Sequence, residues 1–147
     1  MYTILLPTDG SDFANKTLKQ ALSFANALQA RVIALHVEPE FRMPRDEGDF
    51  LPASSRLKQR VDDEHRSHAQ TVLVNVEVAA EAARVDCESV VAMNHSVYEA
   101  IVATADERNC DLIIMASHGH AGVTGLLLGS VTAKVLTHTK LPVLVLH

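Results

Sequence analysis

Hydrophobic and polar residues follow two alternating patterns along this chain. Short apolar runs cover residues 2–6, 31–37, 86–93, 111–115 and 143–146. Such runs are typical of strands that are buried in a parallel sheet. Between them, apolar residues recur every three or four positions, which is the spacing of an amphipathic helix. The pattern therefore predicts strands and helices in strict alternation.

Four helices are predicted between the strands. Ser11 is a good N-cap for the first helix, which continues to Leu28. The second helix covers residues 57–84, the third uses apolar positions from 98 to 105, and the last begins at Ser130. Strict alternation predicts an α/β fold: a three-layer α/β/α arrangement around an open, five-stranded parallel sheet.

The junction between the fourth strand and the last helix is rich in glycine. Four of the chain's 6 glycines lie here, at Gly119, Gly122, Gly125 and Gly129. Glycine lets a backbone approach an oxyanion closely, and a helix N-terminus carries unpaired N–H groups and partial positive charge. The segment therefore predicts a phosphate cradle with donors at Gly129 and Ser130, where the serine hydroxyl could also cap the helix. The alternative is that the glycines only shape a loop.

A second polar residue is expected at the same edge of the sheet. Asp9 follows the first strand directly, in the turn Pro7-Thr8-Asp9-Gly10-Ser11. In open parallel sheets, ligands bind beyond the carboxyl ends of the strands, where the strand order reverses. If the first and fourth strands are neighbours at that point, Asp9 and the segment from Gly119 to Ser130 face one crevice.

Length, charge and composition narrow the class of protein. A chain of 147 residues predicts a single domain, residues 1–147, with enough core to fold without disulfides. Cys87 and Cys110 lack metal-ligand spacing and are expected to be small core residues. A net charge of -5 argues against a nucleic-acid partner. No run approaches the length of a membrane span and no basic segment precedes the first strand, so a cytoplasmic protein without membrane insertion is expected.

Three histidines outside this region are candidate metal ligands. His36 interrupts the second strand near its end, and no residue nearby in the sequence offers a second ligand at usable spacing, so a structural role is expected. His65 and His68 lie three apart on the second helix and are expected on its exposed face. No metal ligands are therefore predicted. Residues 38–55 are expected to form a long surface loop, either a connector or a lid over a site.

The chain resembles the nucleotide-binding branch of the universal stress protein family over essentially its full length. The resemblance rests on PTDGS after the first strand, LHV at the end of the second, DLIIMASHG, LLLGSV and PVLVLH. The family's glycine signature is Gly, two residues, Gly, nine residues, Gly, then Ser or Thr. Gly119, nine residues and Gly129-Ser130 match it, whereas Ala116 replaces the first glycine. Alanine would be strained there only if the position requires positive φ.

The resemblance implies a Rossmann-like sheet with strand order 3-2-1-4-5 and a set of site residues. Pro7, Thr8, Asp9 and Val37 would surround adenosine, with Val37 acting through its backbone and Asp9 through its carboxylate. Met115, Ala116, His118 and Gly119 would line ribose and phosphates, and Gly129, Ser130 and Val131 would hold the phosphate tail. Mg²⁺ or Mn²⁺ would neutralise the phosphates. The family also dimerises commonly through its last strand, which suits an apolar sheet edge.

The function implied is that of an ATP-binding sensor or regulator in stress response, with AMP or ADP as possible alternatives to ATP. His118 and Asp9 are the only titratable candidates for hydrolysis, and no Lys or Arg lies between Gly119 and Ser130 to clamp a γ-phosphate. At most slow ATP hydrolysis is therefore expected, and no catalytic residue is assigned. Two other interpretations remain open: a slow ATPase, and a dimeric interaction module that has lost nucleotide binding through the change at Ala116.

Overall fold

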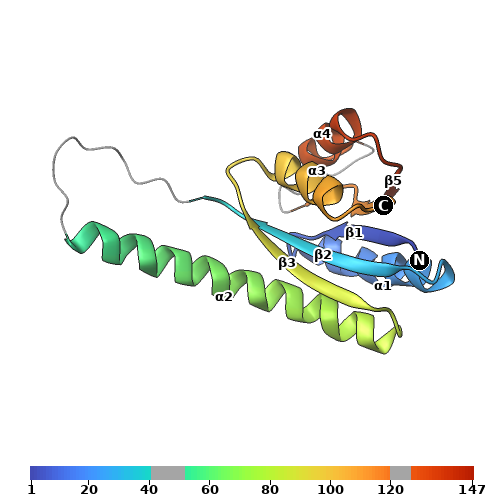
Figure 1. Cartoon of the computed structure of the whole chain (residues 1–147), viewed down its shortest axis with the longest axis horizontal. Helices are drawn as coiled ribbons and strands as arrows, with labels where there is room; N and C mark the ends of the chain where they lie inside the picture. Colours follow the sequence, from blue (N-terminus) through green and yellow to red (C-terminus); the bar gives the residue numbers. More distant parts are fainter. Residues whose placement is uncertain (41–51, 120–126) are drawn as a thin grey trace.

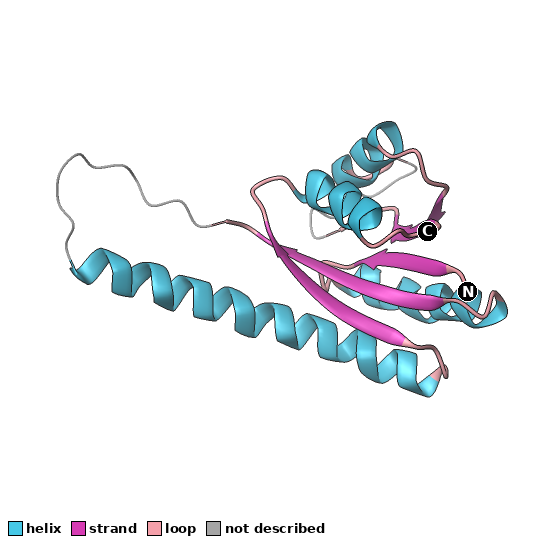
Figure 2. Cartoon of the chain, viewed as in Figure 1, coloured by secondary structure: helices cyan, strands magenta, loops and turns pink. Residues whose placement is uncertain are grey.

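A computed structural model describes residues 1–40, 52–119 and 127–147 of the chain. Strands and helices alternate throughout the described residues, as predicted (Figures 1 and 2). The elements are β1 (Thr3–Pro7), α1 (Asp12–Ala27), β2 (Arg31–Glu38), α2 (Pro52–Ala82), β3 (Cys87–Met93), α3 (Val97–Glu107), β4 (Leu112–Ala116), α4 (Ser130–His138) and β5 (Val143–Leu146). Gly122, Gly125 and most of the predicted loop at 38–55 lie outside the described residues.

The five strands form one parallel sheet with the order β3-β2-β1-β4-β5. The expected strand order 3-2-1-4-5 is therefore confirmed. β1 is the central strand: Leu5 pairs with Ile33 of β2 on one side and with Ile113 of β4 on the other. The strand order reverses on the two sides of β1, so the carboxyl ends of β1 and β4 flank the point where such sheets bind ligands.

Both faces of the sheet are covered, because alternate residues of each strand point to opposite sides. On β2, Val32 and Ala34 belong to the core under α1 and α2, whereas Ile33 and Leu35 belong to the core under α3. Figure 1 shows α1 and α2 on one side of the sheet and α3 and α4 on the other. Cys110 is buried as expected, and Cys87 is half-buried.

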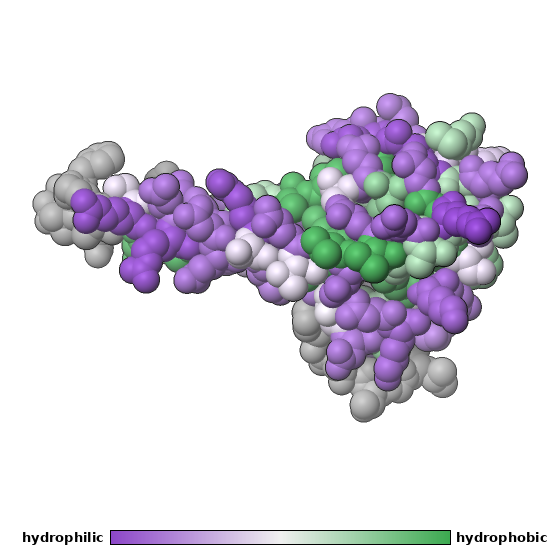
Figure 3. Space-filling view, turned by 90° about the horizontal axis from the view of Figure 1, so that it is seen from below, coloured by the Kyte–Doolittle hydropathy of each residue, from purple (hydrophilic) through white to green (hydrophobic). Residues whose placement is uncertain are grey.

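The second helix is longer than the sequence pattern predicts. It starts at Pro52, a residue that suits the first turn of a helix, and not near Leu57. Among its side chains from Ser55 onward, which the structure describes, the first buried one is Ala69. The preceding half extends beyond the sheet and is mostly hydrophilic (Figures 1 and 3). Among the described residues, no helix has the length and apolar character of a membrane span.

The turn after β1 joins the sheet to α1 through local hydrogen bonds. Asp9 Oδ1 accepts the Ser11 N–H at 2.9 Å, and Ser11 Oγ accepts the Ala14 N–H at 3.1 Å, which confirms Ser11 as the N-cap. Gly10 lies between them with φ of 73°. A Cβ at this glycine would lie 2.6 Å from Val72 Cγ2 of α2. The turn therefore requires glycine both for its backbone angle and for space.

We expect Gly10→Ala to lower the free energy of unfolding by about 2 to 4 kcal/mol, because positive φ and overlap with Val72 both penalise the added methyl group. Urea denaturation of the variant and of wild type measures the difference. Val72→Ala removes the overlap but not the backbone strain, so the double mutant should show a coupling energy that isolates the steric part. Equal stability of Gly10→Ala and wild type would contradict this account of the turn.

Candidate functional site

A cavity of about 260 Å³ lies beyond the carboxyl ends of β1 and β4. The described residues that line it are Pro7, Thr8, Asp9, Ala14, Leu35, Val37, Val97, Ile101, Met115, Ala116, His118, Gly119, Gly129, Ser130, Val131 and Thr132. All eleven residues that the sequence analysis assigned to a binding site are among them. The expected crevice between Asp9 and the segment after β4 is thus present.

Asp9 and Gly119 are in close contact, although 110 positions separate them in the chain. A Cβ placed on Gly119 would overlap Asp9 Oδ2. The pairing of β1 with β4 brings the two residues together, because each follows its strand at the same edge of the sheet. Any side chain at Gly119 would displace the Asp9 carboxylate, so glycine here permits a close approach between the two loops.

The start of α4 differs from the sequence prediction in two respects. Gly129 is the N-cap and Ser130 is the first helical residue, so of the roles that the sequence allowed for the Ser130 hydroxyl, capping of this helix is not the one observed. The Gly129 N–H donates to Ser117 O at 2.7 Å. The expectation that this amide is free to bind a phosphate is therefore wrong. A Cβ on Gly129 would lie 3.0 Å from Ser117 O, which shows how tightly the segment packs on the end of β4.

Other donors remain at this helix terminus. The first backbone hydrogen bond of the helix runs from the Ala133 N–H to Gly129 O at 3.0 Å. The N–H groups of Ser130, Val131 and Thr132 precede it and therefore have no partner within the helix. All three residues line the cavity, and Ser130 is exposed. Backbone donors and the positive end of the helix dipole thus lie at one end of the cavity, an arrangement that suits an anion.

The alanine that replaces the first motif glycine fits the backbone. Ala116 is the last residue of β4 and is not among the residues with positive φ. Its carbonyl oxygen accepts a hydrogen bond from Thr132 Oγ1 at 2.9 Å. The strain considered from the sequence is therefore absent, and Ala116 contributes only a methyl group to the site.

The two ring nitrogens of His118 differ in their hydrogen bonding within the part of the chain that the structure describes. Its Nδ1 shares a hydrogen bond of 2.9 Å with Ser117 Oγ, and its ring lies edge-on to Phe13 at 5.6 Å between centroids. Nε2 is buried and has no hydrogen-bond partner among the described residues. A buried polar atom without a partner is costly, and a ligand in the cavity could supply one.

The sequence analysis missed five of the lining residues. Leu35, Val97 and Ile101 form an apolar part of the wall, and Ala14 and Thr132 complete the lining. Val97 and Ile101 are four positions apart at the start of α3, which follows the carboxyl end of β3. Their helical spacing was visible in the sequence, but only the fold shows that both residues reach the cavity, with Ile101 buried and Val97 partly open to solvent.

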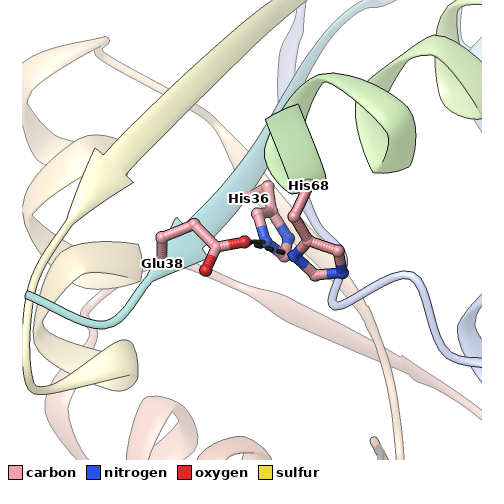
Figure 4. Close-up of side chains that lie close together, drawn as sticks. All are labelled: His36, Glu38 and His68. Carbon is pink, nitrogen blue, oxygen red and sulfur yellow. Dashed lines mark hydrogen bonds and ion pairs between the residues drawn. The ribbon is translucent and has the colours of Figure 1, made fainter. Parts of the chain in front are cut away.

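A second group of polar side chains lies on β2 and α2 (Figure 4). His36 Nδ1 donates to Thr8 O at 2.8 Å, and His36 Nε2 lies 2.7 Å from Glu38 Oε1. His68 Nδ1 contacts the same carboxylate oxygen. His36 is thus a satisfied buried residue and His68 is exposed, as expected. The expectation that His36 has no potential second ligand nearby is wrong, because the fold brings Glu38 and His68 to it.

Glu38 carries charge in this group although it is buried. Burial raises the pKa of its carboxyl, but hydrogen bonds from His68 and His36, together with their positive charge, outweigh that effect and leave the pKa below its ordinary value. The carboxylate therefore stays ionised between two imidazole rings.

The comparisons with known proteins agree with this fold. The model of the universal stress protein family matches residues 1–147. Universal stress protein MJ0531 of Methanocaldococcus jannaschii is 32% identical over 145 residues, which are 97% of this chain and 79% of the relative.

Two solved structures show the same architecture. Protein MJ0577, whose structure served to assign a biochemical function, has a TM-score of 0.81 and 28% identity, with coverage of 99% of this chain and 94% of that chain. A universal stress protein solved in complex with cAMP has a TM-score of 0.67 and 26% identity, with coverage of 99% and 96%. From the whole-length family match and these relatives we conclude that the chain belongs to the universal stress protein family.

Proposed function

We propose that the cavity between β1 and β4 binds an adenine nucleotide, with ATP as the first candidate and AMP or ADP as alternatives, and that the protein is a nucleotide-dependent sensor or regulator in stress response. The observation that carries the proposal is the cavity itself, where an apolar wall and the N-terminal amides of α4 face the same space. A family member 26% identical to this chain has been solved with cAMP, which supports the same class of ligand.

The lining suits the two ends of a nucleotide. Leu35, Val37 and Ile101 form an apolar surface for a base, and the backbone of Val37 offers polar atoms at its edge. Phosphates would lie toward Gly119 and the amides that begin α4 at Ser130. The volume of about 260 Å³ is close to the lower end, about 300 Å³, of the range for small-molecule sites, which favours a mononucleotide over a dinucleotide.

Mg²⁺ or Mn²⁺ would accompany a triphosphate in this site. Asp9 provides the one carboxylate among the described lining residues, and its Oδ1 already accepts the Ser11 N–H. The residues therefore fit an ion that takes its ligands mainly from phosphate oxygens and water, as Mg²⁺ commonly does. The ion would supply neutralisation of the phosphate charge, while the chain binds and orients the nucleotide.

The same lining limits hydrolysis. Asp9 and His118 are its titratable residues, and no Lys or Arg is among the described residues that line the cavity. Without a cation from the protein to stabilise charge on the transferring γ-phosphate, rapid turnover lacks one of its usual components. We therefore propose that the protein binds the nucleotide and hydrolyses it slowly at most. Its response would then be a change in the conformation of the protein and not the release of a reaction product.

The phosphate end is tested by Ser130→Glu, with Ser130→Gln as the matched control. The Glu side chain places a negative charge where the phosphates would lie, and we expect ATP affinity to fall at least about tenfold. A carboxylate in the first helical turn favours the helix, so the fold should be kept. Gln has the same size without the charge and should bind ATP nearly as wild type. Isothermal titration calorimetry measures both, and equal affinities would place the phosphates elsewhere.

Gly119→Val tests the contact between the two loops. The added side chain overlaps the Asp9 carboxylate and intrudes on the cavity, so we expect nucleotide binding to be lost while the far-UV circular dichroism stays unchanged. The protein as purified should also release adenine nucleotide on denaturation, detectable by absorbance and chromatography, whereas Gly119→Val should release none. No released nucleotide and no ATP binding by wild type would favour the interaction module. Rapid phosphate release from added ATP would instead show an efficient hydrolase.

We also propose that the chain forms a homodimer through β5. This strand is at the edge of the sheet, and its apolar residues remain only half-buried at Val143, Leu144 and Val145. The carbonyls of Pro142 and Leu146 accept hydrogen bonds from the N–H groups of Ile113 in β4 and of Ser117 directly after it. Because alternate residues of a strand direct their backbone groups to opposite edges, the Val145 N–H faces away from β4 and can pair with another β5.

Val145→Pro should therefore convert a dimer to a monomer without unfolding the chain. Proline removes the outward N–H, and proline is tolerated on an edge strand when the lost donor does not serve its own sheet. Val145→Thr keeps the donor and serves as the control. Size-exclusion chromatography with light scattering measures the mass of each. A wild-type monomer, or a Val145→Pro dimer of unchanged stability, would contradict pairing through this edge.

A further inference from the structure

The polar group on β2 and α2 contains three potential metal ligands. His36 Nε2, Glu38 Oε1 and His68 Nδ1 all lie within 4.8 Å of one another. His36 and Glu38 come from the carboxyl end of β2, and His68 comes from α2, which packs beside it, as Figure 4 shows. The side chains of His36 and Glu38 are 5% and 6% exposed, and that of His68 is 57% exposed. The group is therefore a mostly buried cluster with one side open to solvent.

The orientation of His36 is that of a metal-bound histidine. A carbonyl oxygen only accepts hydrogen bonds, so the bond to Thr8 O requires the proton on His36 Nδ1. In the neutral ring this leaves the lone pair of Nε2 directed at the Glu38 carboxylate, 2.7 Å away. A cation must lie between these two atoms: a proton, which makes the ring an imidazolium that donates to Glu38, or a metal ion that replaces this proton. Histidine ligands of metals characteristically donate their second ring N–H to a backbone carbonyl in this way, which fixes the ring.

We propose that His36, Glu38 and His68 bind a divalent transition metal ion, with Zn²⁺ as the best match. Two imidazole nitrogens and one carboxylate oxygen form one of the ligand sets that proteins use for zinc, with water in a fourth position. The exposed side of His68 leaves room for that water. Imidazole ligands favour Zn²⁺, Co²⁺, Ni²⁺ or Cu²⁺ over Mg²⁺ and Ca²⁺, which prefer oxygen.

This site is distinct from the nucleotide cavity. Along β2, His36 and Glu38 point to the face covered by α2, whereas Val37 between them points to the opposite face and lines the cavity. Neither His36, Glu38 nor His68 lines the cavity. A metal ion here would therefore not be the ion that accompanies the phosphates, and its binding can be tested in the absence of nucleotide.

The test is titration of the untagged full-length chain with Zn²⁺ alone, without nucleotide, by isothermal calorimetry. Wild type should bind one ion and gain several degrees in Tm, since a metal that binds only the folded state stabilises it. His68→Ala and Glu38→Gln should each weaken Zn²⁺ binding by about 100-fold or more, since even residues that only orient metal ligands contribute 10- to 100-fold. His138→Ala, which removes an exposed histidine from another helix, is the control and should bind as wild type.

Two further measurements keep the outcome unambiguous. Co²⁺ in place of Zn²⁺ should give the visible absorption of a tetrahedral site in wild type but not in His68→Ala, and excess Mg²⁺ should not displace it. His68 is exposed, so His68→Ala should remain folded even if substitutions at the buried residues do not. Equal Zn²⁺ affinity in wild type and His68→Ala would mean adventitious binding only. No Zn²⁺ binding would mean that the three side chains hold only protons, and either result overturns the proposal.

Discussion

The pairing of β1 with β4 is the constraint on which the candidate site depends. Because β1 is central and its two neighbours continue the sheet in opposite directions, the carboxyl ends of β1 and β4 lie side by side with no crossover helix between them. The turn after β1 then meets the segment after β4, and Asp9 contacts Gly119. Had β1 and β4 been separated by another strand, the same residues would form two unrelated loops. The cavity is thus a product of strand order, and the glycine permits the close approach.

Much of the fold could be predicted from the sequence because its signals are local. Strands with both faces covered give continuous apolar runs, helices give a period of 3.6, and their alternation leaves few topologies. The residues that line the cavity could be named for a different reason, namely the resemblance to a family, whose glycine motif includes Gly119 and Gly129. Helix α2 was predicted too short, since its first half is polar on most sides and lacks the periodicity that reports burial. A helical segment that is not buried has no apolar periodicity from which it could be predicted.

The errors at the start of α4 and around His36 share a physical cause. Ser130 is a good capping residue by intrinsic preference, but the N-cap is decided by the bond from Gly129 to Ser117, 12 positions away. Likewise, His36 and Glu38 could have been placed on one face of β2, because they are two positions apart in a strand. The third member, His68, is 30 positions from Glu38, and only the path of α2 across the sheet brings it there. Tertiary hydrogen bonds between distant residues leave no periodic trace in a sequence.

The cluster on β2 and α2 is hard to explain as a device for stability. Its position is where α2 leaves the sheet, since the residues of α2 become buried only from Ala69 onward. Apolar side chains at His36, Glu38 and His68 would hold the helix against the strand there as well, and replacement of a buried ion pair by apolar residues of similar volume is often neutral or stabilising. Burial of the Glu38 carboxylate has a desolvation cost that packing alone does not require. What the polar group can do, and an apolar group cannot, is present a converging set of nitrogen and oxygen lone pairs to a cation.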